Sequence, residues 1–236
     1  AAAIAEDPMG EADRAIMLLQ SIIKRAPADA SALGRLAHLF AKTERTADLL
    51  ALRKHELGLA TEIADHLRLR LDIAELLGRL GDTQGRLAAL RENLAEEPAH
   101  ERSLEEIARL LTEEGAFEDL ASVLELQADE VALRGDEPLA AALFTRAAEL
   151  AEARLADIPR ALAARKRAAA FAPTPETFDA LARLSTLRGD HAAAVAWIER
   201  RLEVLPEHAA ADRIATVARL ADAHVSAGSP DDARAS

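Results

Sequence analysis

The sequence predicts an all-α protein, an α-solenoid of antiparallel helix hairpins stacked in series, with about six hairpins and roughly 12–13 helices. Three observations lead to this prediction: a helix-favouring composition, helical spacing of apolar residues, and a short motif that recurs along the chain. Half of the 236 residues are hydrophobic, and they are mostly Ala and Leu. Ala, Leu, Arg and Glu lose little conformational freedom in a helix, so this composition favours helices over strands.

The recurring motif is an apolar residue, then Ala, any residue, and usually Leu. Its alanines are 37, 34, 40, 34 and 36 residues apart. Such near-constant spacing is typical of a repeat protein, in which each unit buries its apolar face against its neighbours. The six copies are Leu36-Ala37-His38-Leu39, Ile73-Ala74-Glu75-Leu76, Ile107-Ala108-Arg109-Leu110, Ala147-Ala148-Glu149-Leu150, Leu181-Ala182-Arg183-Leu184 and Val217-Ala218-Arg219-Leu220.

Each copy lies in an amphipathic helix that is followed by a turn and a second helix. In the third copy, the apolar residues fall at i, i+3, i+4 and i+7, on one helix face: Leu104, Ile107, Ala108 and Leu111. Glycine, which tolerates the left-handed conformation that ends a helix, follows most copies: Gly81-Asp82, Gly115, Gly189-Asp190 and Gly228-Ser229-Pro230. Proline cannot continue a helix and therefore closes four of the second helices: Pro27, Pro98, Pro173 and Pro206.

A longer period groups the hairpins in pairs. Gly10 to Pro27 aligns with Gly81 to Pro98 at an offset of 71 residues, and Pro98 and Pro173 are 75 residues apart. We therefore expect 1–27 to be the last helix of a preceding repeat, 28–98 and 99–173 to be two hairpin pairs, and 174–236 to be a third, truncated pair. This division predicts that the chain is a piece of a longer array.

The pattern resembles the tetratricopeptide repeat (TPR), a helix–turn–helix unit of 34 residues. The best match runs from Pro175 to Pro206. It places residues at the family's large, Leu-Gly, turn, small, large and Pro positions: Phe178, Leu181-Ala182, Gly189-Asp190, Ala194, Ile198 and Pro206. The resemblance covers nearly the whole chain and implies a fragment of a larger TPR array. Only four of the 29 basic residues are Lys, which favours a GC-rich bacterial genome.

Charge and composition argue against several functions. The net charge of −12 opposes binding to nucleic acid and to anionic membranes. No apolar run is long enough to cross the roughly 30 Å hydrocarbon layer, so membrane insertion is not expected. The chain has no Cys, which excludes thiol catalysis and Cys-ligated zinc and suits a cytoplasmic protein. Metal-binding, nucleotide-binding and nucleophile motifs are missing from the sequence, so no enzyme activity, metal or cofactor is expected.

The resemblance also implies a concave groove lined by the first helix of each hairpin. In that family, the residue after the small-residue position points into the groove. Together with residues one turn away, this gives the expected partner-binding residues His38, Arg68, Glu75, Arg79, Arg109, Glu149, Arg183 and Arg219. The arginines could pair with the carboxylates of an acidic peptide. Alternatively, these residues are solvated charges of a mixed surface.

We expect the protein to be a non-catalytic protein–protein interaction scaffold, with a concave, mixed-charge groove for a peptide or protein partner or for further copies of itself. One alternative is a regulatory or assembly module of a larger enzyme or signalling protein. Another is an RNA-binding helical repeat of the pentatricopeptide kind, which the acidic net charge disfavours.

Overall fold

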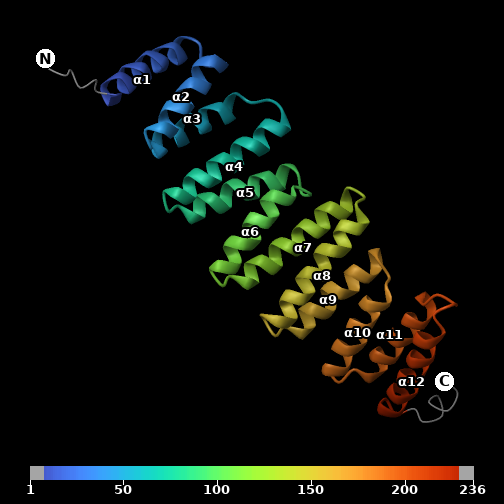
Figure 1. The fold of residues 1–236 in the computed structure, drawn as a ribbon. Helices are drawn as coiled ribbons and strands as arrows, with labels where there is room; N and C mark the ends of the chain where they lie inside the picture. Colours follow the sequence, from blue (N-terminus) through green and yellow to red (C-terminus); the bar gives the residue numbers. More distant parts are fainter. Residues whose placement is uncertain (1–7, 229–236) are drawn as a thin grey trace, which may run out of the picture. The chain divides into compact units, whose positions relative to one another are not determined.

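The protein is a series of α-helices. The computed structural model describes residues 8–228, with side chains from Glu11 onward, and these residues form 12 helices and no strand (Figure 1). The helices that carry the repeated motif, called first helices below, are α2 (Ala30–Lys42), α4 (Ile63–Arg79), α6 (Glu101–Glu113), α8 (Glu137–Ala153), α10 (Pro175–Leu187) and α12 (Ala210–Ser226). The second helices are α1 (Pro8–Arg25), α3 (Thr46–Leu59), α5 (Thr83–Glu96), α7 (Phe117–Leu133), α9 (Ile158–Phe171) and α11 (His191–Val204).

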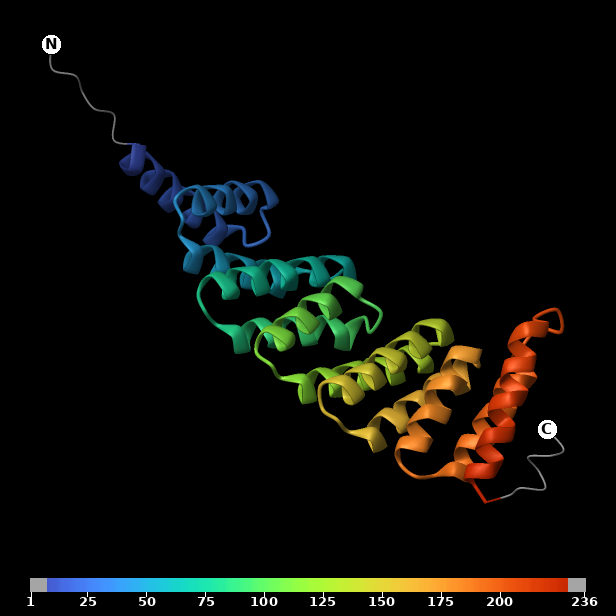
Figure 2. The same ribbon diagram turned by 60° about the horizontal axis from the view of Figure 1, so that its bottom comes forward.

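The chain divides into two compact units, Ala1–Ile107 and Ala108–Ser236, and the division falls within α6. Within each unit, helices that follow one another in the sequence pack side by side and run antiparallel (Figures 1 and 2). Each unit is therefore a stack of helix hairpins, the arrangement of an α-solenoid, and the predicted all-α fold class is confirmed.

The predicted division into hairpin pairs stays a prediction. Interhelical turns do occur at residues 26–29, 97–100 and 172–174, but the compact units do not divide at any of them. The part of the predicted third pair that follows Gly228 lies outside the described residues.

The turn between α4 and α5 combines a left-handed glycine with a capping aspartate. Gly81 has a φ of 77°, and the carboxylate of Asp82 accepts a hydrogen bond of 2.8 Å from the backbone N–H of Gly85 in the first turn of α5. The predicted glycine turns are thus confirmed. In two hairpins, however, the left-handed residue is not glycine but Glu44 (φ 55°) or Ala156 (φ 52°). That conformation is less stable by roughly 1–2 kcal/mol for a residue with a Cβ atom.

The repeated alanine is buried in five of its six copies. Its exposed fraction there lies between 1 % and 7 %: Ala37, Ala74, Ala108, Ala148 and Ala182. Because its side chain ends at Cβ, neighbouring helices can approach closely at this point. The apolar residue that precedes it is also buried, as Ile107 and Leu181 illustrate. The recurring motif therefore marks the contact face of the first helices.

The sixth copy of the motif was placed wrongly, because Ala218 is exposed. Helices α4 and α12 each contain 17 residues, and α12 follows α4 at an offset of 147 residues. At this offset, Ala74 corresponds to the half-buried Ala221, and the residue before it is the buried Leu220. The sixth copy is therefore Leu220-Ala221-Asp222-Ala223. The prediction was wrong because the buried copy ends in Ala and not in the usual Leu. The segment from Val217 to Leu220, which begins three residues earlier, matches the motif better although its alanine is exposed.

Candidate functional site

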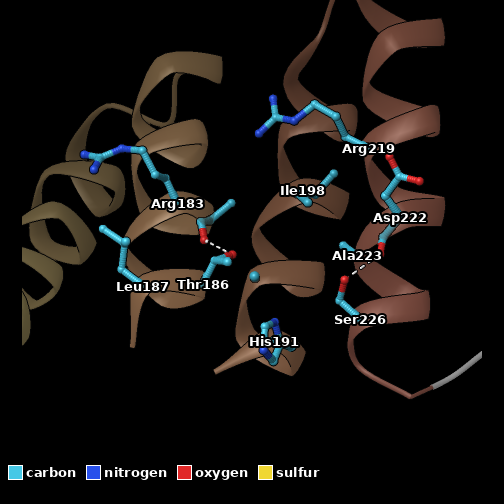
Figure 3. Close-up of a pocket in the computed structure, with 11 residues that line it drawn as sticks. Arg183, Thr186, Leu187, His191, Ile198, Arg219, Asp222, Ala223 and Ser226 are labelled. Carbon is cyan, nitrogen blue, oxygen red and sulfur yellow. Dashed lines mark hydrogen bonds between the residues drawn. The ribbon is translucent and has the colours of Figure 1, made fainter. Parts of the chain in front are cut away.

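A cleft in the C-terminal unit, between α10, α11 and α12, is the candidate functional site (Figure 3). Its volume is about 410 Å³. The wall contains three buried apolar residues: Ala182, Ala194 and Ile198. The rim carries polar and charged side chains, among them Arg183, His191, Arg219 and Asp222. The cleft thus joins an apolar surface to groups that can form hydrogen bonds.

Small side chains create the cleft. Ala182 is the repeated alanine of α10, Ala194 lies opposite it on α11, and Ala223 contributes from α12. None of them reaches into the space between the helices, which larger residues would fill. Thr186 and Ser226 also line the cleft, but their hydroxyl groups donate to carbonyl oxygens of their own helices (Figure 3). This leaves the centre of the cleft open.

Arg183 lines the cleft but is bound by a carboxylate outside it. Its side chain points away from α12 (Figure 3) and donates to both oxygens of Glu152 in α8, with Nη2 at 2.6 Å from Oε2. These hydrogen bonds lower the pKa of Glu152 and raise the pKa of Arg183, so both groups stay charged. The pair links the first helices of two consecutive hairpins.

Arg219 is bound in the same way. Its side chain extends from α12 toward α10 (Figure 3), where Nη1 donates to Asp179 Oδ1 at 2.5 Å. The other oxygen of Asp179 accepts from Nε of Arg201 in α11 at 2.8 Å. One carboxylate therefore holds arginines from two helices. Both predicted groove arginines of this cleft connect helices and are already paired with a carboxylate, although Arg219 shares Asp179 with Arg201.

The polar groups still open to a partner are Asp222 and His191. Within residues 8–228, neither the carboxylate of Asp222 nor the imidazole of His191 has a hydrogen-bond partner. Asp222 follows Ala221, so in the corrected register it takes the position that Arg183 has in α10. Sequence reasoning missed Asp222 because the signal, the burial pattern of α12, exists only in the folded chain.

The predicted groove residues of the N-terminal unit lie on the surface of α2 and α4. His38 is exposed on α2. On α4, Arg68 Nη2 donates to Asp65 Oδ1 at 2.9 Å, and Arg79 Nη2 donates to Glu75 Oε1 at 2.5 Å. Both pairs join residues three or four positions apart on one exposed helix face, an arrangement typical of a solvated surface.

The two remaining predicted residues belong to the C-terminal unit. Arg109 Nη1 donates to Glu113 Oε1 at 2.6 Å within α6. Glu149 of α8 accepts a hydrogen bond of 3.0 Å from Nη2 of Arg165 in α9, and it also lines a second cleft between α8, α9 and α10. Of the eight predicted residues, only Arg183 and Arg219 line the cleft between α10, α11 and α12.

Among residues 8–228, no three or more His, Cys, Asp or Glu side chains are grouped so that they could hold a metal ion. No helix within that range combines the length and the apolar character needed to cross a membrane.

Comparisons with known proteins give structural similarity only. No protein-family model matches the chain, and no curated protein matches it. A crystal structure of MamA protein is 18 % identical with a TM-score of 0.43, over 72 % of this chain and 87 % of that one. A TPR protein from Parabacteroides merdae is 14 % identical with a TM-score of 0.37, over 88 % and 93 %. The TPR-like repeats of a putative kinesin light chain from Podospora anserina are 20 % identical with a TM-score of 0.43, over 71 % and 90 %. Two of these three structures are thus described as TPR or TPR-like, the repeat that the sequence resembles.

Proposed function

We propose that the protein is a non-catalytic protein–protein interaction scaffold, and that the cleft between α10, α11 and α12 receives an apolar side chain from a peptide segment of the partner. One observation carries this proposal: a buried apolar wall, formed by Ala182, Ala194 and Ile198, opens to solvent beside the carboxylate of Asp222, which has no hydrogen-bond partner among residues 8–228. Apolar surface with a few convergent polar groups is the usual composition of a binding pocket.

The charges around the cleft favour a partner segment with a basic residue next to the apolar one. Arg183 and Arg219 already donate to Glu152 and Asp179, so they are less available to an acidic peptide. Asp222, in contrast, can accept a hydrogen bond from Lys, Arg or a backbone N–H. The net charge of −12 would also draw a basic partner toward the chain.

The mixed charges of the other first helices would supply weaker contacts within each unit: His38, Arg68, Glu75 and Arg79 in the N-terminal unit, and Arg109 and Glu149 in the C-terminal unit. Pairs on an exposed surface contribute little affinity, but they tune the association rate and its salt dependence. A cytoplasmic location suits a scaffold without Cys, because disulfides are rare in that compartment. The same acidic charge supports a protein partner over RNA.

Blocking the cleft tests this proposal. Thr186 and Ser226 are exposed, so Thr186→Trp with Ser226→Trp should fill the cleft without disturbing the core. Peptides selected from a random displayed library on the wild-type chain are expected to bind the blocked variant at least about tenfold more weakly, a loss of roughly 1.4 kcal/mol. Asp222→Asn should lower the binding affinity of those selected peptides that carry a basic residue. Fluorescence anisotropy with labelled peptides measures both effects.

The matched control is Ala163→Trp, which adds the same bulk at an exposed position of α9, outside this cleft. It should bind the selected peptides as the wild type does. The proposal fails if no peptide is enriched, or if the enriched peptides bind the blocked variant with unchanged affinity. Binding of a labelled single-stranded RNA at physiological salt would instead support the alternative of an RNA-binding repeat.

A further inference from the structure

The outer face of α12 carries an apolar stripe that no described residue covers. Ile214, Ala218, Ala221 and Val225 are spaced at i, i+4, i+7 and i+11, so they share one face of the helix. Ile214 is 72 % exposed and Val225 is 62 % exposed, and Ala218 is exposed as well. This face is distinct from the cleft, which α12 lines through Arg219 and other residues.

The equivalent face of α4 shows what such a stripe packs against. At the offset of 147 residues, the four positions are Leu67, Leu71, Ala74 and Gly78 in α4. All four are buried or half-buried in the hairpin with α5. Asn93 of α5 donates to the carbonyl oxygen of Leu67 at 3.0 Å. This stripe is therefore the surface through which a first helix meets its second helix.

Two further positions of α5 fix the register of that contact. Leu90 lines a small cleft together with Leu71 and Ala74. A Cβ atom added to Gly78 would lie 3.1 Å from the guanidinium of Arg86. The two helices therefore pack antiparallel. Position 93 of α5 lies opposite position 67 of α4, position 90 opposite positions 71 and 74, and position 86 opposite position 78. On α12, the corresponding stripe has no second helix among the described residues.

Helix α1 presents the complementary face. It aligns with α5 at the offset of 71 residues, so Leu18 corresponds to Ala89 and Ile22 to Asn93. In α5, these residues are 8 % and 0 % exposed, whereas Leu18 is 66 % and Ile22 is 41 % exposed in α1. Each of the two helices is followed by a first helix, α1 by α2 and α5 by α6. Among the described residues, however, only α5 is also preceded by a first helix, α4, which packs against it.

We propose that the α12 stripe of one copy packs on the exposed face of α1 of a second copy, forming across two chains the kind of hairpin that α4 and α5 form within one. Transfer of the α4–α5 register places Ile214 opposite the exposed Ile22 of the second copy and Val225 opposite the half-buried Ala15. Ala218 and Ala221 fall opposite Leu19, which is already buried in the core of its own chain. Every residue in these pairs is apolar, so the contact buries no unpaired polar side chain.

This association is head-to-tail. The two surfaces differ, and each copy carries one of each, so the interface is heterologous and further copies can add at both ends. The proposal is independent of peptide binding in the cleft, because the stripe and the cleft lie on different faces of α12.

Two double variants test the proposal by sedimentation velocity, since each blocks one surface with exposed charges. Ile214→Glu with Val225→Glu blocks the α12 stripe, and Leu18→Glu with Ile22→Glu blocks the face of α1. The wild-type chain is expected to grow beyond two chains in mass as its concentration rises. Each variant alone should keep the mass of one chain, and an equimolar mixture of the two should form a complex of two chains.

The control is Leu133→Glu, which makes the same change at a residue of α7 that is 82 % exposed. It should associate as the wild type does, and all variants should keep the wild-type circular dichroism spectrum. A wild-type chain that stays monomeric at every concentration overturns the proposal, because the α12 stripe is then unused or covered within its own chain. Association of either blocked variant with itself overturns it too, since the contact would then be symmetric.

Cysteine cross-linking tests the register even if a charged variant folds poorly. The chain has no Cys, so single substitutions give unique labels. A mixture of Ile214→Cys and Ile22→Cys chains should yield a mixed disulfide dimer under mild oxidation, and neither should cross-link alone. Replacing Ile22→Cys by Leu133→Cys should abolish the mixed dimer. Equal cross-linking in that control would contradict the proposed contact.

Discussion

Replacing Phe144 with Ala is expected to lower the free energy of unfolding by about 3–5 kcal/mol. Phe144 is fully buried in α8, the helix that packs between α7 and α9. Its ring stacks on that of Phe171 with a centroid distance of 6.2 Å and an interplanar angle of 3°, and the guanidinium carbon of Arg167 lies 4.1 Å from its centroid. The substitution removes the ring from these contacts and leaves a cavity that helices on both sides cannot easily close.

Urea unfolding followed by circular dichroism measures this loss. The matched control is Phe117→Ala, because Phe117 is only half-buried at the beginning of α7, where its ring contacts Arg154. A smaller cavity forms there, so the control should lose less stability. Equal losses for the two variants would show that Phe144 is not at the centre of the C-terminal unit.

Replacing Ala148 with Trp is expected to destabilise the protein by at least about 1–3 kcal/mol, because an indole ring cannot fit where two helices approach over a small side chain. Ala148 is 1 % exposed, and the neighbouring Ala147 is fully buried. Any accommodation must therefore move α8 away from the helices that pack on it. Thermal unfolding reports the loss as a lower midpoint temperature.

The same change at Ala218 is the internal control. Both alanines match the recurring motif, but Ala218 is exposed, so Ala218→Trp should alter stability by less than about 0.5 kcal/mol. The comparison requires a concentration at which the chain is monomeric, since Ala218 belongs to the proposed α12 stripe. A larger loss at Ala218 than at Ala148 would restore the original register of α12 and contradict the corrected one.

The helices and their turns could be predicted because their causes are local. Helix-favouring residues, apolar spacing and the pair Gly81-Asp82 act within one or two turns of chain, and the structure shows each of them in place. The contact face of five first helices could also be predicted, because the recurring alanine marks it within a single helix. In α12, two overlapping segments resemble the motif, the better match is the exposed one, and only packing against α11 identifies the buried one.

The functional surface was less predictable because it depends on partners distant in sequence. Arg183 pairs with Glu152, 31 residues earlier, and Arg219 pairs with Asp179, 40 residues earlier. Spacing along one helix could place these residues on a face, but it could not show that a neighbouring helix supplies a carboxylate to each of them. The cleft likewise needs small residues on three helices at once: Ala182, Ala194 and Ala223.

The stacked-hairpin fold depends above all on the burial of the recurring alanine, and thiol labelling measures that burial directly. In the cysteine-free chain, single Ala→Cys variants at positions 37, 74, 108, 148, 182 and 218 would each carry one reporter. The structure predicts slow labelling at the first five positions, limited by local unfolding, and fast labelling at 218, as for an unfolded peptide. Fast labelling at the five buried positions, with rates like that at 218, would contradict the stacked-hairpin fold on which the cleft and the proposed head-to-tail contact depend.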